Sequence, residues 1–151
     1  PDGDRLVTIA SDCQSVIWSI QKAGALTNIS SHGEGCHESV RVSRQGDRVV
    51  TGVNSVDTDP AIIWNTTDGR QLLALRHDRG RIRFLDMTPC GEKVATSGAH
   101  VTCIWSSTTG VLERCLPKSN GWLVEIAVSP GGAIILDSAW NSVVLRDGRF
   151  G

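Results

Sequence analysis

Val16-Ile17-Trp18, Ile62-Ile63-Trp64 and Cys103-Ile104-Trp105 are three versions of one short motif, in which a tryptophan closes an apolar and mostly β-branched run. The tryptophans stand at positions 18, 64 and 105, so successive copies lie 46 and 41 residues apart. β-Branched and aromatic residues favour strands. Recurrence at intervals of this length is typical of arrays in which each unit is a small sheet. The spacing therefore predicts an all-β repeat protein.

A turn precedes each copy of the motif. The last glycine of this turn stands at positions 3, 46, 91 and 132, and tight turns favour glycine and proline. Five residues after each glycine, a polar residue ends an apolar run: Thr8, Thr51, Thr96 and Asp137. Alternating runs such as Val40-Arg41-Val42 predict first strands, and runs such as 71–75 predict fourth strands. No stretch has a helical period of sufficient length.

The repeats divide the chain into four units, at approximately residues 1–30, 36–76, 81–116 and 122–151. The first unit contains second to fourth strands, and the last contains first to third strands, which makes about three and a half blades of four antiparallel strands. β-Propellers typically close with about 4 to 8 blades. We therefore expect a partial propeller, which is either a piece of a larger ring or a half that a second copy completes.

The ladder of turn glycine, second-strand threonine and third-strand tryptophan resembles the WD-repeat (WD40-type) β-propeller family over essentially all 151 residues. In that family a histidine, a Ser/Thr, a turn aspartate and the tryptophan form a buried hydrogen-bonded network, because a buried indole N–H needs an acceptor. The resemblance implies three such networks: Thr8, Asp12 and Trp18; His32, Thr51 and Trp64; and His77, Thr96 and Trp105.

The repeats depart from the family pattern in several places. The Trp-Asp dipeptide that names the family is absent. In the second unit either Asp57 or Asp59 fills the turn position, and the third unit has Ala99 there. In the fourth unit the positions of histidine, threonine and tryptophan are held by Lys118, Asp137 and Leu145.

Composition gives little support for nucleic acid or membrane partners. Fifteen basic and sixteen acidic residues leave a net charge of −1, and no apolar run is long enough to span a bilayer. Five cysteines without paired spacing predict reduced thiols, with Cys103 acting as a small hydrophobe. The opening Pro1-Asp2-Gly3 suggests a cut inside a longer chain. We expect a cytoplasmic protein.

The loop before the third unit is the strongest candidate for contact with a partner. Residues 76–84 contain four arginines, which suit an acidic or phosphorylated peptide, although a solvated loop balanced by nearby aspartates gives the same pattern. Two tryptophans fall outside the repeat and are either exposed binding residues or, for one of them, a replacement for the tryptophan missing at Leu145. The candidate partner-binding residues are Arg76, Arg79, Arg81, Trp122 and Trp140.

No motif predicts catalysis, a cofactor or a metal. His32 and His77 are 45 residues apart, in step with the glycines, which favours a structural role. His32, Cys36 and His37 lack a second ligand pair at zinc spacing, and no phosphate loop or nucleophile elbow is present. We therefore expect a non-catalytic protein–protein scaffold, for example the sensor propeller of a signalling protein. The alternative is a quinoprotein-like propeller enzyme with its site in the channel of the complete ring.

Overall fold

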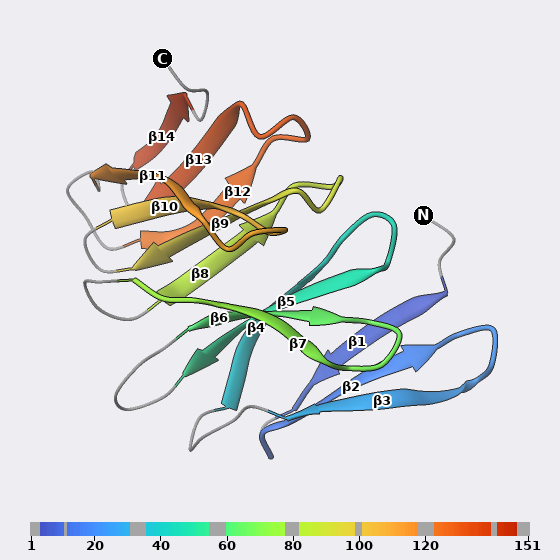
Figure 1. Cartoon of the computed structure of the whole chain (residues 1–151). Coiled ribbons are helices and arrows are strands. Elements are labelled where there is room, and N and C mark those ends of the chain that lie inside the picture. The colour runs from blue at the N-terminus through green and yellow to red at the C-terminus, as the bar shows by residue number, and fades with distance from the viewer. Residues whose placement is uncertain are drawn as a thin grey trace.

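The computed structural model describes residues 4–10, 12–30, 36–54, 60–77, 82–98, 101–117, 123–139 and 142–147. All regular secondary structure in these ranges is β-strand, arranged in four antiparallel sheets that lie side by side along the chain (Figure 1). The prediction of an all-β protein made of small antiparallel sheets is confirmed.

Each sheet consists of strands that are consecutive in the chain and paired in sequence order. Sheet A contains β1 (Arg5–Ile9), β2 (Gln14–Ser19) and β3 (Gly24–Ser30). Sheet B contains β4 (Cys36–Val42), β5 (Arg48–Asn54), β6 (Ala61–Asn65) and β7 (Gln71–Leu75). Sheet C contains β8 (Ile82–Met87), β9 (Lys93–Gly98), β10 (Val101–Ser106) and β11 (Leu112–Pro117). Sheet D contains β12 (Leu123–Val128), β13 (Ile134–Ala139) and β14 (Ser142–Asp147).

The central hairpin has the same register in sheets A, B and C. The tryptophan of the third-strand motif pairs with the residue three positions after the turn glycine: Leu6 with Trp18, Val49 with Trp64 and Val94 with Trp105. In the pairing with the next strand, a register shift occurs between each tryptophan and the residue before it. The repeat seen in the sequence is therefore also a repeat of backbone pairing.

Glycine is required at the turn between the first and second strands. Gly46, Gly91 and Gly132 have φ of 71°, 76° and 70°, a left-handed conformation that side chains with a Cβ rarely adopt. Each of them donates its N–H to the carbonyl three residues earlier, at 2.8–2.9 Å. The turn glycines of the sequence pattern thus close β-turns of one kind.

The turn before the last strand follows a similar rule, with one exception. Gly69 and Gly110, each five residues after a tryptophan, have φ of 69° and 73°. In sheet A the fifth residue after Trp18 is Ala23, with φ of 49°, and Gly24 is instead the first residue of β3. A residue with a Cβ therefore occupies a left-handed position that the other two turns give to glycine.

Ala23→Gly is expected to raise the free energy of unfolding by about 0.5–1 kcal/mol, because glycine adopts this φ without the steric cost of a Cβ. Gly69→Ala is the matched opposite change and is expected to lower stability, because a Cβ there would lie 2.5 Å from Thr27 Oγ1 at a φ of +69°. Urea unfolding of both variants measures the two effects. A loss of stability in Ala23→Gly would show that the strain is absent.

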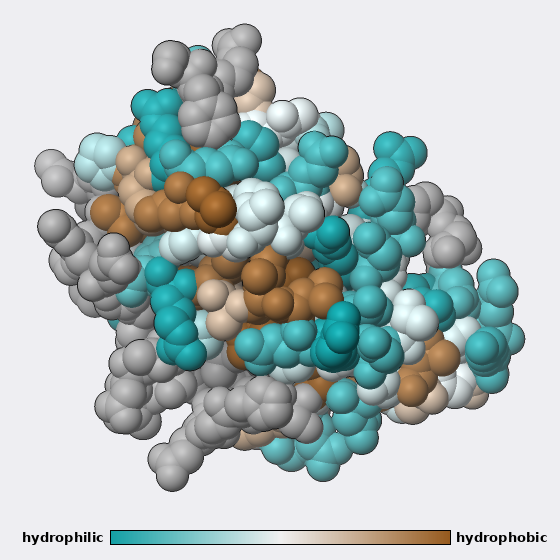
Figure 2. Space-filling model, in the orientation of Figure 1, coloured by the Kyte–Doolittle hydropathy of each residue, from teal (hydrophilic) through white to brown (hydrophobic). Residues whose placement is uncertain are grey.

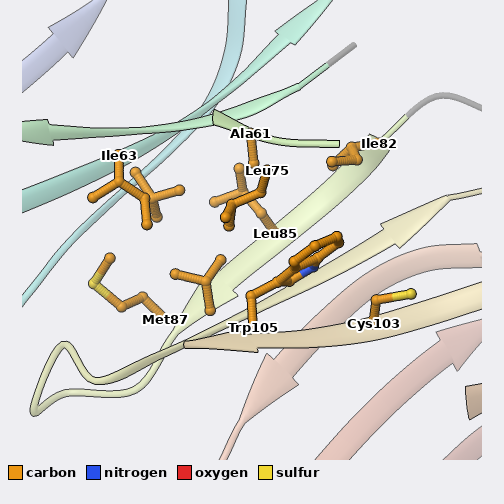
Figure 3. Close-up of a cluster of buried hydrophobic side chains, with 10 residues drawn as sticks. Ala61, Ile63, Leu75, Ile82, Leu85, Met87, Cys103 and Trp105 are labelled. Atoms are coloured by element: carbon orange, nitrogen blue, oxygen red, sulfur yellow. The ribbon is translucent and has the colours of Figure 1, made fainter. Parts of the chain in front are cut away.

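The sheets pack face to face through three clusters of buried side chains. The A–B cluster contains Ile17, Ile29, Val49, Ile62 and Trp64, and the C–D cluster contains Ile104, Leu116 and Ile135. The B–C cluster is the largest, and in Figure 3 the indole of Trp105 lies next to Leu75, Ile82 and Leu85. Each tryptophan of sheets B and C therefore faces the preceding sheet, because side chains alternate between the two faces of a strand.

The innermost strands are joined by polar contacts. Arg41 Nε on β4 donates to Asp86 Oδ1 on β8 at 3.0 Å. The other oxygen of the same carboxylate, Asp86 Oδ2, accepts the backbone N–H of Val128 on β12 at 2.8 Å. One carboxylate thus connects sheets B, C and D on the side where their first strands meet.

The outward faces of sheets A and D carry exposed apolar side chains. Trp18 is 36% exposed, whereas its equivalents Trp64 and Trp105 are 2% and 6% exposed beneath the preceding sheet. On sheet D, Val143 and Leu145 are 63% and 69% exposed, on the side away from sheet C. These two faces resemble the interior faces of the stack in composition but not in burial.

Candidate functional site

Polar side chains form hydrogen-bonded pairs inside the stack of sheets. The indole Nε1 of Trp64 donates to Thr51 Oγ1 at 2.8 Å, and that of Trp105 donates to Thr96 Oγ1 at 2.7 Å. Both threonines are fully buried. The strand register explains both contacts, because each tryptophan and its threonine lie two residues apart along paired strands and share a face.

His77 adds a third member to the network of sheet C. It lies two residues after β7, so the end of sheet B carries it onto the neighbouring sheet. Its Nε2 lies 2.7 Å from Thr96 Oγ1, and its ring stacks on Trp105 with 6.0 Å between centroids and an interplanar angle of 19°. The histidine thereby links sheets B and C through a hydroxyl and an aromatic face.

This group fixes side chains and does not present a reactive hydroxyl. A threonine beside a histidine has the composition of a nucleophile and its base. Thr96 is nevertheless 0% exposed, and its oxygen also accepts the indole N–H of Trp105. Among the described residues, this oxygen is therefore closed off from solvent and already hydrogen-bonded.

Sheet A contains the same pair in an exposed setting. Trp18 Nε1 donates to Thr8 Oγ1 at 2.9 Å, but both side chains are exposed on the outward face. Asp12 Oδ1 accepts the backbone N–H of Gln14 at 3.0 Å, two residues further along its own turn. The expectation that Thr8 and Trp18 are buried is wrong in this structure, because no described sheet covers their face.

Sheet D replaces the tryptophan–threonine pair with an ion pair. Arg146 pairs with Ile135, and Ile135 lies three residues after the turn glycine Gly132. Arg146 therefore holds the position of the third-strand tryptophan, which the sequence alignment had given to Leu145. Its Nε donates to Asp137 Oδ2 at 2.5 Å, and Asp137 is 2% exposed. The alignment was wrong by one residue, because it matched apolar character, whereas the structure keeps a donor–acceptor pair.

The ion pair also reaches back to sheet C. Thr102 Oγ1 donates to Asp137 Oδ1 at 3.2 Å, and the hydroxyls of Thr102 and Ser97 lie 3.0 Å apart. All three side chains are buried. A continuous polar chain therefore crosses the C–D junction in a region where the apolar cluster is small.

A pocket of about 220 Å³ opens beside the His77 network, between the end of sheet B and the last two strands of sheet C. Figure 2 shows apolar side chains gathered at the centre of the visible face, between the positions of β7 and β11 in Figure 1. The residues that line the pocket are Arg76, His77, Val101, Cys103, Trp105, Leu112 and Cys115. Arg76 is exposed and is the candidate binding residue that the structure places here.

The pocket wall includes a disulfide that the sequence analysis did not expect. Cys103 on β10 and Cys115 on β11 are paired across the hairpin with 4.1 Å between their Cα atoms, and they are joined by a disulfide. The prediction of reduced thiols is wrong for these two residues, and for Cys13, which is also disulfide-bonded. Spacing alone did not reveal the pair, but the register of the hairpin after Trp105 brings the two cysteines opposite one another.

Cys115→Ser is expected to lower the free energy of unfolding by about 2–3 kcal/mol, because it removes a cross-link that restricts the unfolded chain. Urea unfolding with and without a thiol reductant measures the difference. The exposed Cys90 supplies the control, since Cys90→Ser removes a free thiol and should change nothing. Equal stability of the wild-type protein with and without reductant would contradict the prediction.

A surface carboxylate in sheet A has a perturbed acidity. Asp4 Oδ1 accepts the backbone N–H of Gln21 at 2.8 Å and the hydroxyl of Ser19 at 2.7 Å. These two hydrogen bonds, the first being the larger cause, lower the pKa of Asp4 below its ordinary value of 3.8. The ionised carboxylate therefore stabilises the turn between β2 and β3.

A lowered pKa in the folded state means that Asp4 contributes stability above its unfolded pKa and loses it as the pH falls through the folded value. Asp4→Asn is therefore expected to reduce the loss of stability on acidification below about pH 4. Urea unfolding of both proteins, in steps from neutral pH to below the folded pKa, tests this. Parallel acid profiles for variant and wild type would refute it.

Several of the residues singled out in the sequence lie outside the described ranges. They are His32, Asp57, Asp59, Arg79, Arg81, Ala99, Lys118, Trp122 and Trp140. Of the candidate partner-binding residues, Arg76 lies in the described ranges and lines the pocket. Nothing in the sequence gives a reason to join Val101, Leu112, Cys103 and Cys115, which line the same pocket, to a site.

A scan against models of protein families finds no match for this chain, and no curated protein matches it significantly. In the described ranges, no helix has the length and apolar character needed to cross a membrane. Likewise, no group of three or more His, Cys, Asp or Glu side chains in those ranges is arranged to hold a metal ion.

Proposed function

We propose that this chain is part of a WD-repeat-type β-propeller that acts as a non-catalytic scaffold for protein–protein contacts. The observation that carries the proposal is the indole-to-threonine hydrogen bond that recurs in sheets A, B and C at the same register. The histidine that joins this pair in sheet C supports it further. Such networks stiffen a sheet, and a stiff array is suited to presenting loops to a partner.

The proposed partner is an acidic or phosphorylated peptide or protein surface. Arg76 supports this choice, because it is exposed and stands at the rim of a pocket. Guanidinium groups bind carboxylates and phosphates through paired hydrogen bonds. The net charge of −1 gives no general attraction for polyanions, so the contact would be local and neither nucleic acid nor membrane is proposed.

Selection of displayed random peptides on the folded full chain tests the scaffold function without assuming where the peptide binds. We expect acidic sequences to be enriched over a selection on the urea-unfolded chain, and their affinity to fall with added salt. If no sequence is enriched over the unfolded control, the scaffold proposal is overturned.

The outward faces of sheets A and D are proposed to be covered by further sheets, supplied by a longer chain or by a second copy. Trp18 with Thr8 repeats a pair that is covered in sheets B and C. Sedimentation at several protein concentrations tests this for the chain itself, with self-association expected. A monomer that stays monodisperse at high concentration would count against coverage by a second copy.

The Cys103–Cys115 disulfide bears on the compartment in which the protein works. Disulfides persist in oxidising compartments and are rare in the cytoplasm, so this pair counts against the cytoplasmic location that reduced thiols had suggested. We therefore propose an oxidising compartment, and the state of the two cysteines in cells is its test. Rapid alkylation of free thiols in intact cells, followed by mass spectrometry, should find both cysteines protected. Alkylation of both cysteines would overturn the assignment.

A further inference from the structure

We propose that the pocket beside Trp105 is the anchor of the peptide site, taking one aliphatic side chain of an extended acidic peptide while Arg76 binds a neighbouring carboxylate of that peptide. This proposal rests on the scaffold function above and adds to it a location and a ligand chemistry. It concerns the outer end of the B–C junction, where β7 and β11 are the last strands of their sheets.

The pocket is held open by groups that cannot easily collapse into it. Trp105 is fixed by its hydrogen bond to Thr96 and by stacking on His77. On the other side, the disulfide fixes Cys103 against Cys115. A cavity with such walls exists before the ligand arrives, so binding does not require ordering of these side chains.

The size of the pocket restricts what enters it. Its volume of about 220 Å³ is smaller than the roughly 300–1,000 Å³ of pockets that hold drug-sized ligands. The pocket is therefore smaller than those that enclose a nucleotide or an organic cofactor. A single aliphatic side chain fits, and its natural neighbours are the partly exposed Leu112 and the indole of Trp105.

The lining chemistry defines the rest of the ligand. Among the described lining residues, Arg76 carries the positive charge, and the others offer mostly apolar or aromatic surface. An arginine beside an apolar pocket matches an aliphatic residue adjacent to a carboxylate, because the guanidinium binds that carboxylate while the apolar group leaves water.

The position of the pocket favours a peptide over a small free acid. β11 is the outermost described strand of sheet C, so its backbone edge has no described strand beside it. An extended peptide that adds to a sheet edge gains main-chain hydrogen bonds, and its alternate side chains enter pockets beside that edge. Leu112 and Cys115 place the pocket directly at this strand.

Fluorescence anisotropy of a labelled, end-capped peptide with one leucine between two glutamates tests the proposal on the full chain. We expect saturable binding that weakens at least about tenfold in Arg76→Glu and in Leu112→Glu. Both positions are exposed, so the folds should survive, as thermal melting will show. Arg44→Glu is the matched control, because Arg44 is also exposed and lies in the turn between β4 and β5. This variant should bind the peptide as tightly as the wild-type protein does.

The ligand is tested in the same way. Replacing the leucine of the peptide with serine, or both glutamates with glutamine, should each weaken binding at least about tenfold. If 4-methylpentanoate competes as well as the peptide does, the pocket is a small-acid site and the peptide proposal fails. If displayed peptides are enriched on the chain but bind Arg76→Glu and Leu112→Glu normally, this pocket is excluded while the scaffold function stands.

Discussion

Arg146→Ala is expected to lower the free energy of unfolding by about 3–5 kcal/mol, the largest effect of any single substitution considered for this chain. The change leaves the carboxylate of Asp137 in the C–D junction, 2% exposed, without the cation that neutralises it. Removing one partner of a buried ion pair costs far more than replacing both, because the remaining charge loses its hydration without compensation.

Equilibrium urea unfolding of Arg146→Ala measures this loss, and two further variants make the result specific. Arg44→Ala removes an exposed arginine and is expected to change stability by less than about 0.5 kcal/mol. The double variant Asp137→Thr with Arg146→Trp installs the pair of sheets B and C and should recover much of the lost stability. If this double variant is no more stable than Arg146→Trp alone, Arg146 and Asp137 do not act as the equivalent of the tryptophan–threonine pair.

Thr96→Val is expected to lower the free energy of unfolding by about 3 kcal/mol. The hydroxyl of Thr96 serves both the indole N–H of Trp105 and Nε2 of His77, and a buried polar group left without its partner costs about 1–3 kcal/mol. Valine has nearly the shape of threonine, so the packing changes little and the loss reports the hydrogen bonds.

Thr8→Val provides the comparison, because it removes the same bond to a tryptophan in an exposed position. Water replaces the lost partner of Trp18 there, so the expected cost is below about 1 kcal/mol. Urea unfolding of the two variants side by side gives the difference. Equal losses would mean that burial does not determine the strength of this pair, and would contradict the account of the stack.

The division into strands and sheets was largely predictable from the sequence, because each unit carries its own turn residues and strand motif. The turn glycines and the tryptophans, which recur at similar intervals, predicted the strands, their order and the division into four sheets. The left-handed φ of Gly46 and Gly91 explains why glycine recurs at those turns. The misplacement of Arg146 has a physical cause: an alignment by hydrophobicity follows apolar side chains, whereas the paired strands preserve a donor opposite an acceptor.

The candidate site was less predictable, because it depends on cross-strand register and on contacts between sheets. Arg76 was identified from its basic neighbourhood, but nothing in the spacing joined it to Leu112, which lies on another sheet. Reduced thiols were predicted for Cys103 and Cys115 because the cysteines show no paired spacing and disulfides are rare in cytosolic proteins. Plain counting outward from the turn at Gly110 places Cys103 opposite Arg114, and only the register shift between Ile104 and Trp105 brings it opposite Cys115. The sequence gives no sign of that shift.

The unequal size of the three interior clusters has a consequence for how the molecule opens. Among the described buried residues, ten belong to the B–C cluster, against five between A and B and three between C and D. In a stack where each sheet touches mainly its neighbours, local opening begins at the weakest junction. Amide protons of sheet D should therefore exchange with solvent first, those of sheet A next, and the amide protons of β6 and β9 should persist until the whole chain unfolds.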